Sequence, residues 1–206
     1  RSIGQFIMQK IVLASGNAGK LKEFQQLLSG CGFDVVPQSD FNVPEAEETG
    51  LTFVENAIIK ARNAAQYTGL PAIADDSGLE VDALNGQPGI YSARFSGPNA
   101  TDETNNTKLL SELTNIPKHQ RLAHYQCLLV FIRHATDSTP IICQGRWDGA
   151  ILLEARGVGG FGYDPLFWVA DYSCSAAEME PAIKNTISHR GRAMAALLDQ
   201  LKAHSV

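Results

Sequence analysis

Several short segments of the sequence combine residue types that can bind phosphate, hold a metal ion and move a proton. The first is Ser15-Gly16-Asn17-Ala18-Gly19-Lys20, which lies between a strand-like run and a helical pattern. Glycine lets the backbone approach a ligand, N–H groups at a helix start attract phosphate, and Lys20 adds a cation. The spacing is not that of a Walker A loop. A plain glycine turn with a solvated lysine is the alternative interpretation.

A second segment, Asp75-Asp76-Ser77-Gly78, follows the strand-like run from Pro71 to Ala74. Ligands of α/β sheets gather at the carboxyl ends of strands, and adjacent carboxylates there suit Mg²⁺. One carboxylate could also take a proton from an attacking water. A turn whose aspartates cap backbone N–H groups is the competing interpretation.

Two further carboxylates, Glu47 and Glu48, stand before a predicted helix that carries Lys60. Acidic residues are common before helices, so a solvated acidic loop is one interpretation. An extra metal ligand facing Asp76 is the other. Lys60 belongs to a polar stripe of that helix, where surface charge pairing is the simpler alternative.

Two segments near the C-terminus could recognise a base. The run Gly157 to Gly162 matches G-x-G-x-x-G but opens no helix, so dinucleotide binding is rejected. We expect a flexible loop that displays Phe161 and Tyr163 for stacking, with burial of both rings as the alternative. Farther on, Ser188 is a natural N-cap, and His189-Arg190 could donate to a ligand oxygen or simply lie on the surface.

The elements that position these segments are predicted from hydrophobic periodicity. The first part of the chain alternates strand, helix, strand, helix, strand, which predicts an α/β layer with part of the sheet parallel. Later runs predict an antiparallel hairpin and two helices. The predicted ranges are 10–14, about 20–32 with Gly32 as the cap, 33–36, 53–67, 71–74, 101–113, 123–133, 140–151 and 188–203.

Composition narrows the class of protein. The chain has 206 residues, 44% of them hydrophobic, which suffices for one domain or two joined lobes. A net charge of -5 disfavours binding to nucleic acid polymers. No apolar run approaches the roughly 20 residues of a membrane helix, and four scattered cysteines favour a reducing cytoplasm. We expect residues 8–206 to form a single domain of two lobes, and residues 1–7 to be an expression remnant before a natural start at Met8.

As a set, these segments resemble one family, the inosine triphosphate pyrophosphatases, and within it the bacterial branch. The resemblance runs from Ser15 to Arg190 and implies an α/β fold: an elongated mixed sheet with flanking helices, in two lobes around a central cleft, and a homodimer. It also implies Mg²⁺-dependent hydrolysis of ITP, dITP and XTP to the monophosphate and pyrophosphate. The matching segments are SGNAGK (15–20), EETGLTFVENAIIKA (47–61), ADDSGLEVDALNGQPGIYSARFSG (74–97), GGFGYDP (159–165) and KNTISHRG (184–191).

The resemblance also implies roles for individual residues. The turn with Ser15, Gly16, Asn17, Ala18, Gly19 and Lys20 would hold the triphosphate, helped by Lys60. Glu48 and Asp76 would bind magnesium with Glu47 and Asp75 in support, and Asp76 would be the general base. Ser77, Phe161, Gly162, Tyr163, Asp164, Lys184, His189 and Arg190 would contact substrate, with Phe161 stacking on the base. Many relatives carry threonine where this chain has Ser15, which keeps the hydroxyl.

Two other functions compete with this interpretation. A Maf-like nucleotide pyrophosphatase would prefer pyrimidine or modified nucleotides, and the GGFGYDP and SHR segments argue against it. A non-catalytic nucleotide-binding protein would need no carboxylate beside a phosphate, so Asp75, Asp76 and Glu48 argue against that one.

Overall fold

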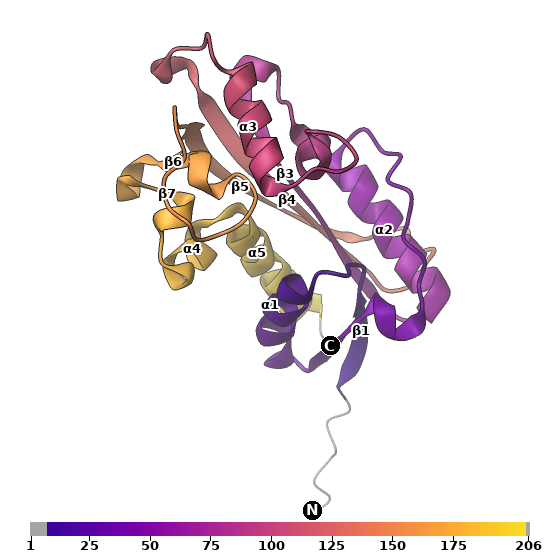
Figure 1. Ribbon diagram of the computed structural model, residues 1–206. Helices are drawn as coiled ribbons and strands as arrows, with labels where there is room; N and C mark the ends of the chain where they lie inside the picture. Colours follow the sequence, from indigo (N-terminus) through magenta and orange to yellow (C-terminus); the bar gives the residue numbers. More distant parts are fainter. Residues whose placement is uncertain (1–7, 205–206) are drawn as a thin grey trace, which may run out of the picture. The chain divides into compact units, whose positions relative to one another are not determined.

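A computed structural model describes residues 8–204, so the expected remnant at residues 1–7 lies outside the described residues. Its principal helices and strands follow one another along the chain as the ribbon shows (Figure 1). They are β1 (Gln9–Leu13), α1 (Ala18–Ser29), β2 (Phe33–Pro37), α2 (Phe53–Thr68), β3 (Ala72–Val81), α3 (Asp102–Glu112), β4 (Leu122–Ile132), β5 (Ile141–Ile151), β6 (Phe167–Val169), β7 (Cys174–Ser175), α4 (Pro181–Ile187) and α5 (His189–His204). Within residues 8–204, no helix combines the length and apolar composition that a membrane crossing requires.

The strands form one sheet in the order β2-β1-β3-β4-β5-β6-β7. Strand β1 pairs in parallel with β2 and β3, whereas β6 pairs antiparallel with β5 and β7. The sheet is therefore mixed, and the predicted α/β class with flanking helices is confirmed. The two long runs expected to form a hairpin are β4 and β5, which are neighbours in the sheet.

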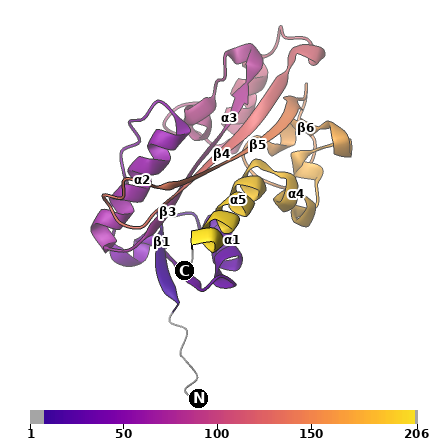
Figure 2. The ribbon, with the colours of Figure 1, turned by 180° about the vertical axis from the view of Figure 1, so that it is seen from behind.

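The chain divides into two compact units. Unit 1 comprises residues up to Asp76, together with Leu128–Cys143 and the segment that begins at Met194. In this unit α1 and α2 lie on opposite sides of β1, as both ribbon views show (Figures 1 and 2). Four alanines of α2 are buried against the sheet, which lets the helix approach the strands closely: Ala57, Ala61, Ala64 and Ala65.

Unit 2 comprises Ser77–Cys127 and Gln144–Ala193. Its core is built around aromatic side chains, with the rings of Tyr125 and Phe167 4.5 Å apart and those of Trp147 and Phe167 5.0 Å apart. Such tilted pairs are the arrangement that aromatic rings prefer in a core. The polar groups that could recognise a base are anchored on this aromatic core.

Three expectations about these elements are corrected. Strand β3 does not end at Ala74 but continues to Val81, because Leu79 and Val81 are fully buried in the core of unit 2. Helix α1 ends at Ser29 with Gly30 as its C-cap, and Gly32 instead takes a left-handed conformation, with φ of 81°, before β2. Helix α4 was not expected, although Pro181 in its first turn is a common helix-start residue.

Candidate active site

The glycine-rich segment connects β1 to α1, as its sequence predicts. The side chain of Asn17 caps α1 by accepting a hydrogen bond from the Lys20 backbone N–H at 3.0 Å. The Ser15 hydroxyl accepts one from the Asn17 N–H at 3.1 Å. The first-turn N–H groups of Ala18 and Gly19 have no acceptor within the helix, since no residue precedes them by a full turn. This turn can therefore offer N–H groups to an anion.

Asp75 anchors the lysine that follows this turn. The Lys20 ammonium lies 3.0 Å from Oδ1 of Asp75, whose side chain is only 2% exposed. Asp75 and Asp76 both lie inside β3, so the turn once considered for them is wrong. Adjacent side chains of a strand point to opposite faces, and the two carboxylates accordingly have different partners. Asp75 binds Lys20, whereas Asp76 faces Lys60.

Lys60 of α2 brings three segments of unit 1 together. Its ammonium lies 3.0 Å from Oε1 of Glu48 and 3.6 Å from Oδ1 of Asp76, and it donates to the Asp75 carbonyl at 2.6 Å. Burial alone would lower the pKa of Lys60. The carboxylates of Asp75, Asp76 and Glu48 outweigh burial, so the pKa of this lysine is raised and the ammonium stays charged.

Asp76 is an acid of this group whose pKa is clearly raised. Burial, strengthened by the charges of Glu48 and Asp75 and opposed by Lys60, raises its pKa from 3.8 to about 6. Its Oδ2 atom is buried and has no hydrogen-bond partner within residues 8–204. A carboxylate that is short of partners and repelled by a second carboxylate is suited to a cation.

The acidic residues fit a magnesium site in which the protein supplies only some of the ligands. Among residues 8–204, no three Asp, Glu, His or Cys side chains are grouped closely enough to form a complete protein cage for a metal. Mg²⁺ commonly takes one or two carboxylates and fills its other positions with water and substrate phosphates. Glu48 and Asp76, which converge on Lys60, supply such a partial set. The side chain of Glu47 is exposed, and its supporting role stays a prediction.

The loop that carries Glu48 is fixed to α2. The buried side chain of Asn56 accepts from the Gly50 N–H at 2.8 Å and donates to the Gly50 carbonyl at 3.4 Å. Thr52 caps α2 by accepting a hydrogen bond from the Glu55 N–H. A Cβ at Gly50 would lie 2.6 Å from that of Glu55, so the close approach requires glycine.

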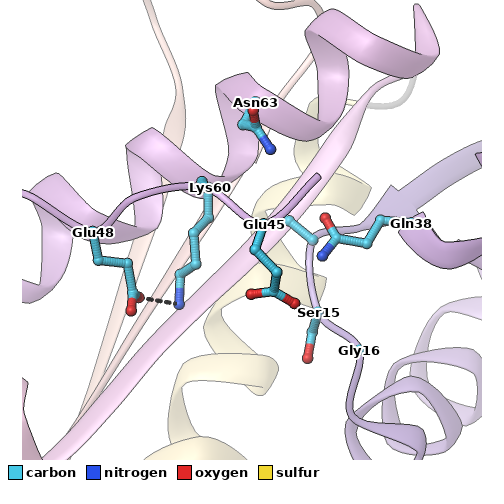
Figure 3. Close-up of a pocket in the computed structure, with 9 residues that line it drawn as sticks. Ser15, Gly16, Gln38, Glu45, Glu48, Lys60 and Asn63 are labelled. Atoms are coloured by element: carbon cyan, nitrogen blue, oxygen red, sulfur yellow. Dashed lines mark ion pairs between the residues drawn. The ribbon is translucent and has the colours of Figure 1, made fainter. Parts of the chain in front are cut away.

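Of the predicted site residues, Ser15, Gly16, Glu48 and Lys60 line a cavity of about 150 Å³ within unit 1 (Figure 3). Sequence reasoning missed three of its polar residues, namely Gln38, Glu45 and Asn63. Signals for them existed. Gln38 follows the carboxyl end of β2, Asn63 is three residues beyond Lys60 on the same helix face, and Glu45 belongs to the acidic loop. In Figure 3 the Glu45 carboxylate points toward Ser15.

In unit 2, Phe161 is displayed on the surface beneath two cations. Its side chain is 55% exposed, with Lys184 Nζ 4.8 Å and Arg190 Cζ 5.2 Å from the ring centroid. The rings of Tyr163 and Phe161 differ in exposure. Tyr163 is 4% exposed and donates its hydroxyl to the Ser92 carbonyl at 2.6 Å. The prediction that Tyr163 is displayed is therefore wrong, because its hydroxyl has a buried partner and its ring can enter the core.

Asp164 is the buried anchor of this second group. It accepts hydrogen bonds from the Tyr125 hydroxyl and the Phe161 N–H, both at 3.0 Å, and forms an ion pair with Lys184. His189 is also buried and stacks on Tyr125, with centroids 4.5 Å apart. Burial of Asp164 favours a role in holding Phe161 and Lys184 rather than a direct contact with substrate.

The predicted site residues thus form two groups, each gathered within its own unit. Unit 1 holds the residues from Ser15 to Lys20 with Glu47, Glu48, Lys60, Asp75 and Asp76, and unit 2 holds Ser77, in β3, with residues 161–164, Lys184, His189 and Arg190. The Ser188 hydroxyl accepts from the Gly191 N–H at 3.1 Å and so caps α5 as predicted.

Comparison with known proteins gives a consistent result. A model of the Ham1 family matches residues 11–200. The dITP/XTP pyrophosphatase of Vibrio cholerae is 60% identical over 95% of this chain and 98% of its own length. The dITP/XTP pyrophosphatase of Thioalkalivibrio sulfidiphilus is 60% identical over 94% of this chain and 98% of its own length. The solved HAM1 protein of Coxiella burnetii superposes with a TM-score of 0.92 at 49% identity, covering 95% of this chain and all of that one.

Proposed function

Because the chain belongs to the Ham1 family, we propose that it clears deaminated purines from the nucleotide pool by hydrolysing their triphosphates. It is a nucleoside triphosphate pyrophosphatase that converts non-standard purine triphosphates such as dITP, ITP and XTP to the monophosphate and pyrophosphate. The observation that carries this function is the convergence of Glu48 and Asp76 on the Lys60 ammonium, beside the anion-binding turn at Ser15. Two alternative functions, a Maf-like pyrophosphatase and a non-catalytic nucleotide-binding protein, explain this arrangement less well. Neither accounts for relatives that are dITP/XTP pyrophosphatases.

We assign the chemistry to unit 1. Water attacks the α-phosphorus, a new P–O bond forms, and the bond from the α-phosphorus to the bridging oxygen breaks as pyrophosphate leaves. Asp76 takes the proton of the attacking water, because the burial that raises the pKa of the metal-free carboxyl to about 6 makes it a stronger base than an exposed aspartate. Lys20 and Lys60 offset the charge of the departing pyrophosphate. The N–H groups of the turn at Ala18 and Gly19 orient the phosphates.

We assign the metal to Glu48 and Asp76, with Glu47 and Asp75 in support. When bound, Mg²⁺ would neutralise phosphate charge and polarise the phosphoryl group. The buried Oδ2 of Asp76 and the repulsion between the two carboxylates support this assignment. Lys60 would hold both acids in place in the absence of the ion.

We assign recognition of the purine base to unit 2. Phe161 offers a half-exposed ring for stacking, and Lys184 and Arg190 lie over that ring as donors. Hypoxanthine and xanthine carry a C6 carbonyl that can accept a hydrogen bond, whereas adenine carries an amino group there. A buried donor facing that amino group would stay unsatisfied, at about 1–3 kcal/mol for each mispaired group. This difference favours deaminated bases over adenine.

We further propose that the enzyme is a homodimer that works in the cytoplasm without nucleic acid polymers or membranes as partners. All four cysteines are free thiols, which suits a reducing compartment. The net charge of -5 opposes binding to polyanions. Light scattering at several concentrations tests the dimer.

The decisive experiment measures pyrophosphate release from ITP, XTP, ATP, GTP and dTTP, each with and without Mg²⁺. Fast release from ITP and XTP that requires magnesium, with much slower release from ATP, is the expected result. Equal release from every nucleotide, or none from ITP, overturns the proposed function.

A further inference from the structure

Helix α3 holds the loop that carries Phe161 through a single residue, Gly162. The Gly162 N–H donates to Oδ2 of Asp102 at 2.9 Å, and Nδ2 of Asn106 donates to the Gly162 carbonyl at 3.0 Å. Asp102 and Asn106 are four residues apart and so lie on the same face of α3. Both backbone polar groups of one loop residue are therefore bound to one helix.

Gly162 is the position at which this loop separates an exposed ring from a buried one. Its φ is 60°, in the left-handed region, and a Cβ there would meet no atom within 4 Å. Phe161 on one side is exposed, whereas Tyr163 on the other is buried and bonded to Ser92. Hydrogen bonds that fix the peptides on both sides of Gly162 therefore fix the direction in which the Phe161 ring projects.

Packing does not explain why position 106 carries an asparagine. Its Oδ1 atom is buried and finds no hydrogen-bond partner in the part of the chain that the structure describes. A buried acceptor without a partner lowers stability, and an apolar side chain of similar size would avoid that loss. The contribution of asparagine at this position is its hydrogen bond to Gly162.

Helix α3 itself is a firm support for these two residues. Thr101 caps it in a capping box with Thr104, and the buried Asn105 binds the Ser96 N–H and the Ala93 carbonyl. Leu109 is fully buried in the core of unit 2. Asp102 and Asn106 therefore project from a helix fixed on both sides of them.

We propose that Asp102 and Asn106 are positioning residues that set base selectivity by clamping Gly162. The inference rests on the proposed recognition of the base at Phe161. Without the clamp, the ring would leave the position in which Lys184 and Arg190 lie over it, so stacking and donor placement would be lost together. Neither residue needs to touch the substrate.

The test compares Asp102→Ala and Asn106→Leu with the neighbouring exposed variant Glu103→Ala, which removes the same charge from the first turn of α3. Steady-state kinetics are measured with ITP and ATP. We expect the KM for ITP to rise about tenfold in each clamp variant, with a smaller change in kcat and a reduced ratio of kcat/KM for ITP over ATP. Asp102→Asn keeps an acceptor for Gly162 and is expected to restore most of the selectivity.

Hydrogen exchange of the segment 157–163 provides a second readout, which is expected to quicken in the two clamp variants and not in Glu103→Ala. A purely structural role would lower kcat by reducing the folded fraction, at unchanged KM and unchanged selectivity, and would overturn the inference. So would wild-type selectivity in both clamp variants. Failure of the proposed function is recognised separately, because the wild-type protein itself would then fail to prefer ITP.

Discussion

The ammonium of Lys60 donates a 2.6 Å hydrogen bond to the backbone carbonyl of Asp75. This contact fixes the lysine to β3 independently of the carboxylates that it also faces, Glu48 and Asp76. Lys60 thus holds the acid pair in place, in addition to the phosphate-binding role that we propose for it. Substitutions in this cluster should change proton binding, metal binding and folding stability together, because one set of charges governs all three.

Asp76→Asn should remove turnover while it stabilises the metal-free protein. Loss of a general base lowers kcat by about 10²–10⁴-fold. The raised pKa means that ionised Asp76 destabilises the fold. This cost is fully present above pH 6 and disappears as the pH falls toward 3.8. Urea unfolding in EDTA should show the variant about 1–3 kcal/mol more stable at pH 7.5, with little difference near pH 4.

The matched control is Asp199→Asn on the exposed face of α5. It removes an equal charge and should change neither turnover nor the free energy of unfolding. Wild-type turnover in Asp76→Asn would show that the base is another group. Equal stability of the wild type and Asp76→Asn at pH 7.5 would contradict the burial argument.

Magnesium affinity should fall in acid, since protons and the metal compete for Asp76. Below a pKa of about 6, the apparent affinity is expected to weaken by about tenfold for each pH unit. Calorimetric titration with Mg²⁺ between pH 5 and pH 8 measures this slope, and the heats in two buffers give the protons released. A flat pH dependence in the wild type would mean that Asp76 is not a ligand.

Lys60→Met should move the acid limb of the pH profile of kcat/KM to higher pH. Lys60 lowers the pKa of Asp76, so its removal lets that pKa rise above about 6. Lys22→Met, an exposed change on α1, is the control for general loss of charge. The measurement is the pH profile of kcat/KM for both variants and the wild type at one fixed magnesium concentration. An acid limb that does not shift in Lys60→Met would show that ionisation of Asp76 does not determine that limb.

Tyr125→Phe should destabilise unit 2 and weaken binding of the base. The change removes the hydroxyl that donates to Asp164, and a buried carboxylate oxygen left without that donor costs about 1–3 kcal/mol. Because Asp164 also holds Lys184 and the Phe161 N–H, the KM for ITP should increase. Tyr172→Phe, at a tyrosine that is 47% exposed, is the control and should leave both quantities unchanged.

The elements that sequence predicts best are those whose ends depend on local signals. Helix α2 begins after the Thr52 cap and ends at Gly69, which takes the left-handed conformation that glycine permits. Strand β3 was predicted too short for the opposite reason. Asp75 and Asp76 look like a turn locally, whereas the burial of Leu79 and Val81 in the core of unit 2 keeps the strand extended to Val81.

The site follows the same division. The turn at Ser15 and the carboxylates Glu48 and Asp76 could be proposed from sequence because their chemistry is visible in short segments. The burial of Tyr163 and the support of Phe161 by Asp102 could not, since each depends on a partner far away in the chain. No local pattern marks a residue whose contribution is to hold another residue.

The residues that we propose for phosphate and for base belong to different units, and this has a consequence for how substrate preference could evolve. Every acid and lysine assigned to the cleavage step belongs to unit 1, and the aromatic platform with its cations belongs to unit 2. On the proposed assignment, substitutions around Phe161 would change which base is accepted and leave the residues proposed for hydrolysis unaltered. Exchange of the segment 157–164 between relatives would therefore change the nucleotide preference while the hydrolysis reaction stays the same.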